Sequence, residues 1–368
     1  MDFVCQRSDL ARGIATVERA VGAHDDREIL EGILIRADGD RLQLVATNLE
    51  LGIECYVPAV IRRPGAAVLN GRVLGQIVRK LGGDDVVYTT EENKTARIES
   101  GRSRFTVHTM DADDFPSLPQ VDAGPMWRIS QGQLKRMIRH TAFAAAADDS
   151  RPFLTGVLFE VEEGELRLVA TDSSRLSYYE SRLKEPAAQG GTGIVPLPCL
   201  TELARILDSD DETDVEFTVT ESQAVFCLPD ARVISRVIEG RFPDYRRVMV
   251  VDQPCKFTLS RQELYDAIER VSLVARRNTP IVRVKVADGL LALSAHEAEV
   301  GQAFEEIPVA QQGQDHETAY QARYLLEVLR AMDADEIEVG LGEGLRQGSI
   351  RAVGDEAFIY IVMPVRVG

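Results

Sequence analysis

The sequence has little of what marks secreted, membrane-spanning or zinc-binding proteins. Its 368 residues contain five cysteines, an odd number without a C-x-x-C pair, at Cys5, Cys55, Cys199, Cys227 and Cys255. Such scattered thiols favour free cysteines over disulfides or a zinc site. No apolar run approaches the roughly 20 residues that span a bilayer, and the first ten residues lack the basic and apolar regions of a signal peptide. We therefore expect a cytoplasmic protein without membrane contacts.

Recognisable motifs for catalysis are also lacking. There is no G-x-S-x-G, H-E-x-x-H or Walker A pattern, and the glycine-rich run at 340–349 lacks the G-K-[ST] ending that binds phosphate. The acidic run at 208–214 resembles the start of a calcium loop, but Thr213 replaces the required Gly and Val219 the closing Glu. We interpret both runs as turns, expect no metal or cofactor, and keep a metal-dependent hydrolase only as a remote alternative.

One phrase occurs three times at almost equal intervals: LQLVATNLELG from Leu42, LRLVATDSSRL from Leu166 and LALSAHEAEVG from Leu291. The spacings are 124 and 125 residues. Apolar residues recur every three to four positions before each copy, at 8–22, 132–146 and 261–275, and again after it, at 71–83, 198–211 and 321–335. We expect Ser8, Ser130 and Ser260 to be N-caps.

The stretches between these helices alternate apolar and polar residues, as at 96–108, 232–238 and 357–363, which is typical of half-buried strands. The pattern predicts three α+β repeats with mainly antiparallel sheets. Extended stretches separate them, and the predicted domains are 1–121, 122–252 and 253–368.

Positive charge is scarce overall but concentrated in the predicted helices. The chain has 42 Lys and Arg against 59 Asp and Glu, a formal net charge of −17, which by itself disfavours a nucleic-acid partner. Six helical segments nevertheless contain 16 Lys or Arg against 7 Asp or Glu: 7–22, 72–81, 132–146, 198–207, 261–277 and 322–332. The rest of the chain therefore carries a formal net charge of −26. Either the helices form one basic surface, or each has an ordinary solvated face.

Three segments resemble a known family. ATDSSRL (170–176) is similar to the family motif A-T-D-G-H-R-L, and YIVMPVRV (360–367) is similar to Y-V-V-M-P-M-R-L. The third segment, GRFPDYRRV (240–248), matches the family motif outright. The family that these segments resemble is the bacterial DNA sliding clamp, the beta subunit of DNA polymerase III. The resemblance covers the whole chain. It implies the DNA clamp fold: three tandem copies of one α+β domain, with antiparallel sheets outside and helices lining a central channel, and two chains joined head to tail as a ring.

The resemblance also implies a function. A clamp is a non-catalytic processivity factor that encircles double-stranded DNA without reading its sequence and tethers the replicative polymerase α subunit, the clamp loader and other proteins with a clamp-binding motif. Two departures from the family stand out: Ser173 and Ser174 replace Gly-His, and AHDDREIL at 23–30 is less basic than usual. They leave open a diverged paralogous clamp, specialised for repair or for resistance to an inhibitor.

The resemblance assigns residues to three surfaces. Residues expected to bind partner peptides are Leu154, Thr171, Ser173, Ser174, Arg175, Leu176, Pro243, Arg247, Val248, Ile361, Val362, Met363, Pro364 and Val365, with Arg175 and Arg247 at the rim. Residues expected to face DNA are Arg72, Arg79, Lys80, Lys135, Arg136, Arg139 and Arg205. Residues expected at the dimer interface are Arg102, Arg104, Phe105, Leu273, Val274, Glu299 and Glu305.

Overall fold

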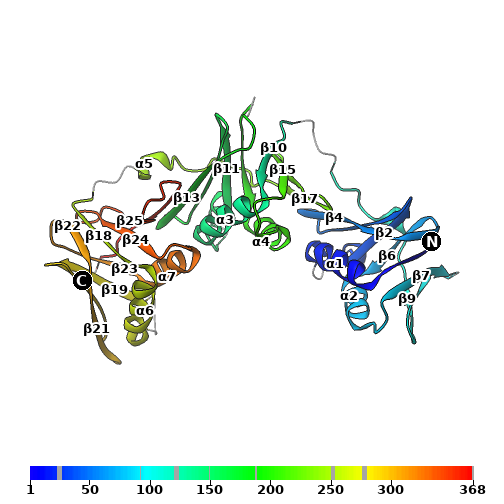
Figure 1. The fold of residues 1–368 in the computed structure, drawn as a ribbon, viewed down its shortest axis with the longest axis horizontal. Helices are drawn as coiled ribbons and strands as arrows, with labels where there is room; N and C mark the ends of the chain where they lie inside the picture. The colour runs from blue at the N-terminus through cyan, green and yellow to red at the C-terminus, as the bar shows by residue number, and fades with distance from the viewer. Residues whose placement is uncertain are drawn as a thin grey trace. The chain divides into compact units, whose positions relative to one another are not determined.

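The computed structural model describes residues 1–22, 27–91, 93–119, 124–148, 150–186, 189–249, 253–275 and 280–366. The chain forms two compact units (Figure 1): unit 1 is Met1–Gly132 with Thr201–Val237, and unit 2 is Gln133–Leu200 with Ile238–Gly368. The predicted domain boundaries, after residues 121 and 252, lie outside the described residues, as do positions 23–26 of the AHDDREIL segment. Among the described helices, none is long and apolar enough to cross a membrane.

The six predicted helices are present, each with a shorter α-helical part than predicted. They are α1 (Arg7–Val17), α2 (Gly71–Lys80), α3 (Gln131–Thr141), α4 (Leu197–Ile206), α6 (Arg261–Ser272) and α7 (Ala322–Ala331). A short helix, α5 (Arg246–Met249), follows the second repeat. The helices α1, α3 and α6 each continue into a 3₁₀ turn, at Glu18–Ala20, Ala142–Ala144 and Leu273–Ala275.

The predicted N-caps have different outcomes. The Ser260 hydroxyl accepts a hydrogen bond from the Glu263 amide, so this cap is confirmed. The prediction that Ser8 caps α1 is wrong, because α1 begins one residue before Ser8 and Gln6 occupies the cap position. Ser130 directly precedes α3, and its hydroxyl donates to Asp211 at 2.9 Å.

Within the described residues, unit 1 contains two sheets whose strand pairs are antiparallel. One has the order β5 (Val60–Arg63), β1 (Asp2–Gln6), β7 (Asp85–Glu91), β8 (Thr95–Ser100), β9 (Ser103–His108). The other has the order β10 (Trp127–Ser130), β15 (Asp214–Val219), β16 (Gln223–Cys227), β17 (Ala231–Arg236), β4 (Leu51–Pro58), β3 (Arg41–Thr47), β2 (Gly32–Asp38), β6 (Gly65–Asn70).

Unit 2 also contains two antiparallel sheets in its described part. The larger has the order β14 (Gly191–Pro196), β11 (Gly156–Glu162), β12 (Glu165–Thr171), β13 (Arg175–Arg182), β26 (Phe358–Val362), β25 (Gly348–Ala352), β24 (Glu336–Leu341), β18 (Cys255–Ser260), β22 (Ala310–Gly313). The smaller has the order β21 (Gly301–Pro308), β20 (Leu290–Glu297), β19 (Ile281–Ala287), β23 (His316–Gln321).

The sheets are built from two strand motifs, each present three times. The first motif is β1-β7-β8-β9, β10-β15-β16-β17 and β18-β24-β25-β26; the second is β4-β3-β2-β6, β13-β12-β11-β14 and β21-β20-β19-β23. The repeated phrase forms β3, β12 and β20, the same strand of the second motif. The three predicted α+β repeats are therefore confirmed.

Neighbouring repeats join through their sheets. The last strand of a first motif pairs with the first strand of the preceding repeat's second motif, β17 with β4 and β26 with β13. In the described part of the chain, β9 and β21 are the corresponding strands without such a partner, so each ends its sheet.

Each of the six longer helices packs through an apolar stripe. In α6 the buried positions are Leu264, Ala267, Ile268 and Val271, a spacing of three to four residues that places them on one face. In unit 1, α1 packs beside α2, and in unit 2, α6 packs beside α7 (Figure 1). The opposite faces carry the polar and basic side chains.

Candidate functional site

Unit 2 contains an apolar cleft of about 300 Å³. Its lining residues come from the β12–β13 turn with its strand ends, from the segment that leads into α5, and from the end of β26 with the residue after it: Thr171, Ser173, Arg175, Leu176, Pro243, Asp244, Tyr245, Val248, Ile361 and Met363. Apolar walls with a few polar groups are typical of sites for small ligands or short peptides.

Strand pairing brings these distant segments together. The pairing of β13 with β26 places Leu176 opposite Ile361, and beyond the strand the Met363 amide donates to the Ser174 carbonyl at 2.8 Å. The cleft therefore forms where the second repeat joins the third. Both Leu176 and Ile361 belong to the hydrophobic cluster below the cleft, which also includes Tyr245.

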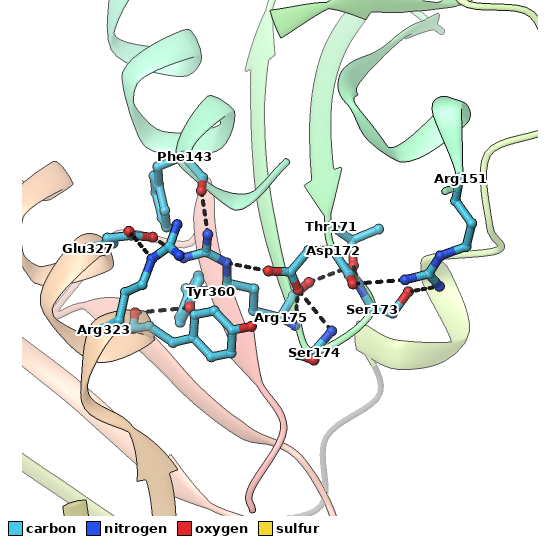
Figure 2. A network of polar contacts seen from close by, with 11 residues as sticks. Phe143, Arg151, Thr171, Asp172, Ser173, Ser174, Arg175, Arg323, Glu327 and Tyr360 are labelled. Carbon is cyan, nitrogen blue, oxygen red and sulfur yellow. Dashed lines mark hydrogen bonds and ion pairs between the residues drawn. The ribbon is translucent and has the colours of Figure 1, made fainter. Parts of the chain in front are cut away.

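The β12–β13 turn is held by Asp172. Its Oδ1 accepts from the Ser174 and Arg175 amides at 2.9 and 3.1 Å. Ser173 has φ +80°, a left-handed conformation that costs a non-glycine residue about 1–2 kcal/mol. Arg151 stabilises this conformation, because its guanidinium donates to the Ser173 hydroxyl at 2.5 Å and to the Asp172 carbonyl at 3.3 Å (Figure 2). The serine departure is thus accommodated through Arg151, a residue that the sequence analysis missed.

Arg175 differs from its predicted place at the rim. Its side chain is buried, and its guanidinium donates to Asp172 at 3.0 Å, to Glu327 of α7 and to the Phe143 carbonyl at 2.6 Å (Figure 2). It also stacks on the Tyr324 ring at 4.5 Å. Burial opposes its charge, yet its polar neighbours raise the pKa of Arg175. These bonds make Arg175 a structural link between the turn and α7, rather than a group held out toward a ligand.

Other predicted cleft residues lie away from the lining. Leu154 and Val362 are buried in the core, while Pro364 and Val365 follow β26 and are half-buried. Arg247 is exposed and pairs with Asp244 at 2.9 Å. Asp244 and Tyr245 line the cleft but were not predicted, although both stand within the quoted segment GRFPDYRRV.

The residues predicted to face DNA are divided between the units. Arg72, Arg79 and Lys80 are exposed on α2, Arg205 is exposed on α4, and on α3 Arg139 is exposed while Lys135 and Arg136 are half-buried. Acid partners lie beside Arg79 (Glu18 at 2.9 Å), Arg205 (Glu202 at 2.8 Å) and Arg139 (Asp333). Burial and the charge of Arg136 lower the pKa of Arg139. These pairs reduce the positive potential of the helices.

The residues predicted for the dimer interface lie on the two open sheet edges and beside them. Arg104 and Phe105 are on β9, where Arg104 pairs with Glu99 and Phe105 is 37% exposed. In unit 2, Leu273 is 48% exposed, and Glu305 on β21 pairs with Arg270. Arg102 and Glu299 are exposed, and Val274 is half-buried. The sequence analysis missed Phe304 of β21, a 65% exposed aromatic ring.

Acidic and thiol side chains form no candidate metal site in the described ranges, where no group of three or more His, Cys, Asp or Glu could hold an ion. The five cysteines are free, and four of them are buried.

Three repeats of two strand motifs, joined edge to edge, define the class of DNA sliding clamps. Family models of the DNA polymerase III beta subunit match residues 1–119 (N-terminal domain), 128–244 (central domain) and 246–366 (C-terminal domain). The chain is 31% identical over 378 residues to the Beta sliding clamp of Bacillus subtilis, with both chains fully covered. It is 31% identical over 376 residues to that of Staphylococcus aureus strain Mu50, covering 100% and 99% of the two chains.

The fold agrees with these matches. The crystal structure of the Bacillus subtilis DNA polymerase sliding clamp superimposes with a TM-score of 0.96 at 30% identity over the full length of both chains. The chain belongs to the DNA polymerase III beta subunit family. It is a DNA sliding clamp, a non-catalytic processivity subunit, as the sequence predicted. None of these matches favours the paralogue or the hydrolase alternative.

Proposed function

We propose that two copies of this chain join head to tail into a ring around duplex DNA, and that the cleft binds peptides of the replicative polymerase α subunit, the clamp loader and other clamp-motif proteins. The observation that supports the ring is the open pair of sheet edges. Both joints inside the chain use the same strand pairing, and β9 of one copy with β21 of another would repeat it. Pairing also covers exposed strand edges, which otherwise promote aggregation.

The strand pairing between repeats inside the chain predicts which residues of β21 would pair in the proposed contact. In β20 and β21, Ala295 is opposite Ala303, as Ala170 is opposite Ser177 in the second repeat. Because Ala170 and Ala295 hold the same place in the repeated phrase, Ala303 corresponds to Ser177. At the joint of β13 with β26, Ser177 is opposite Tyr360.

The β9 side follows in the same way. Phe105 is opposite Ile98 in β8, as Tyr360 is opposite Ile350 in β25, and both pairs hold the same place in the first motif. The proposed register therefore sets Phe105 opposite Ala303 of the other copy. The next pair would be Arg104 with Phe304, where a guanidinium can lie over an aromatic ring.

The basic helices α2 and α3 would supply the attraction for DNA. Phosphate contacts attract DNA without reading its sequence, and sliding requires that they stay weak. The acid partners of Arg79 and Arg139 are consistent with weak attraction. Retention would then depend on ring closure rather than on affinity.

Replacement of Lys135, Arg136 and Arg139 by Ala tests the DNA surface. Each lost phosphate contact lowers the slope of log affinity against log salt by about 0.9, so we expect a decrease of up to about 2.7. Arg182→Ala, which removes an exposed arginine at the end of β13, is the control and should leave the slope unchanged. An unchanged slope in the triple variant would show that α3 does not face DNA.

Calorimetry with a C-terminal peptide of the polymerase α subunit tests the cleft. The matched variant is a chain ending at Val362, which keeps all of β26 but removes Met363, the lining residue after it. Loss of a flexible apolar wall should weaken binding by at least about tenfold. Equal affinities of the two chains would place the peptide elsewhere.

Two smaller points belong to the same proposal. We assign the protein to the cytoplasm, where free cysteines stay reduced. We also keep 1–121, 122–252 and 253–368 as the boundaries of the three clamp domains.

A further inference from the structure

One wall of the cleft is a short segment that cannot hold itself in place. Pro243, Asp244, Tyr245 and Val248 line the cleft, and α5 contains only the four residues Arg246–Met249. A helix of one turn has no stability of its own, because nucleation costs more than one hydrogen bond returns. The position of this wall must therefore be set by contacts with the rest of unit 2.

Tyr245 provides the first of these contacts. Its carbonyl accepts from the Val248 amide at 3.0 Å and from the Met249 amide at 3.2 Å, so α5 begins from this residue. Its ring is buried in the cluster below the cleft, 5.8 Å from the Tyr178 ring. A fixed Tyr245 therefore also fixes Val248, and with it this wall of the cleft.

Glu160 of β11 holds both Tyr245 and the first residue of α5. The Tyr245 hydroxyl donates to Glu160 Oε2 at 2.7 Å, and the Arg246 guanidinium donates to the same oxygen at 2.7 Å. Hydrogen bonds to a carboxylate are roughly twice as strong as neutral ones. Burial and the bond to Glu160 raise the pKa of Tyr245, so its phenol remains a donor.

We propose that Glu160 is a positioning residue for partner binding: it holds the wall formed by 243–249 in the binding-competent position before a peptide arrives. The role rests on the proposed peptide site of the cleft. A peptide that meets a preformed wall binds without the cost of ordering it, whereas a wall that is ordered only part of the time lowers the apparent affinity in proportion.

The chain offers a matched control two residues away. Glu162 lies on the same face of β11, is 57% exposed, and pairs with Arg167 at 2.8 Å and with Arg246 at 3.5 Å. The Tyr245 hydroxyl donates to Glu160 and not to Glu162. Glu162→Gln therefore removes the same charge from the same surface, while it keeps the bond that fixes the wall.

Hydrogen exchange of the full-length protein without peptide tests the fixing of the wall. In Glu160→Gln and Tyr245→Phe we expect the Val248 and Met249 amides to exchange about tenfold faster, since their bonds to the Tyr245 carbonyl open more often. Glu162→Gln should exchange like the unchanged protein. Equal exchange in all four proteins would overturn the proposal, whatever the peptide does.

Binding kinetics of the α-subunit peptide test the consequence. If the wall is formed only a tenth to a fifth of the time in Glu160→Gln, the association rate falls about fivefold to tenfold and the dissociation rate does not change. The melting temperature should remain that of Glu162→Gln, because the core below is intact. An unchanged association rate would refute the role of Glu160 while the cleft stands. Absence of binding to the unchanged protein would refute the cleft itself, and the role with it.

Discussion

Acidification should destabilise unit 2 through a single buried histidine. His140 of α3 is 7% exposed and makes edge contacts with the rings of Tyr179 at 5.3 Å and Phe358 at 5.0 Å. Its Nδ1 donates to the Arg136 carbonyl at 2.8 Å. Burial is the main cause that lowers the pKa of His140 from its ordinary value of 6.5 to about 4, and the charges of Arg139 and Arg136 act in the same direction.

The sign of the effect follows from the two states. Between pH 6.5 and about 4 the unfolded chain binds a proton at this histidine and the folded chain does not, so the free energy of unfolding falls as the pH falls. One pKa unit corresponds to 1.36 kcal/mol, so the complete loss is about 3 kcal/mol, and about 2 kcal/mol of it is reached by pH 5. Above pH 6.5 the contribution is fully present.

The variant His140→Phe isolates this contribution. Phenylalanine keeps a ring between Tyr179 and Phe358 but cannot be protonated, so acid should destabilise the variant less than the unchanged protein. Urea unfolding followed by circular dichroism at pH 7.5 and pH 5 measures both. We expect the unchanged protein to lose about 2 kcal/mol more over this interval. Equal losses would show that His140 titrates near its ordinary pKa and would refute the reasoning.

Three further outcomes test other parts of the structure. Phe105→Arg with Leu273→Asp places charge on both sides of the proposed subunit contact and should give a monomer by light scattering; a dimer would refute that contact. Ser173→Gly removes the left-handed strain, which stabilises the fold by about 1 kcal/mol, and the bond from Arg151, which destabilises it by a similar amount, so the melting temperature should change little. Because Ser173 lines the cleft, calorimetry should find an altered peptide affinity. Unaltered affinity would exclude Ser173 from the peptide contact. Arg175→Leu removes the buried guanidinium from Asp172, from the Phe143 carbonyl and from Glu327, which keeps its pair with the exposed Arg323, and should lower the unfolding free energy by about 3 kcal/mol in urea titrations; a loss under 1 kcal/mol would contradict its linking role.

The sequence predicted the repeats and helices because periodicity directly reports which positions are buried. The stripe of Leu264, Ile268 and Val271 on α6 is an example. The ends of helices were less predictable: Ser8 has the chemistry of an N-cap, yet the edge of β1 sets where α1 begins. A cap preference contributes about 1 kcal/mol, less than the packing of a strand.

The cleft was predictable only in part, because its residues act through space. Of the residues that the resemblance assigned to partner binding, Leu176, Pro243 and Met363 line this cleft, because each lies in one of the quoted segments. It could not reveal that Arg175 is fully engaged with Asp172 and α7, because those partners are set by the three-dimensional fold. For the same reason the contact between Glu160 and Tyr245, 85 residues apart, left no signal in the sequence.

Retention on circular DNA is the most direct test of a ring that encircles duplex. The protein is loaded by the clamp loader onto a nicked circular plasmid, and the complex is passed through a gel-filtration column at a salt concentration that abolishes phosphate contacts. We predict that the protein stays with the circle and is lost after a single cut that linearises the plasmid, because only a closed ring is held by topology. Equal release from both forms, or equal retention on both, would contradict an encircling ring.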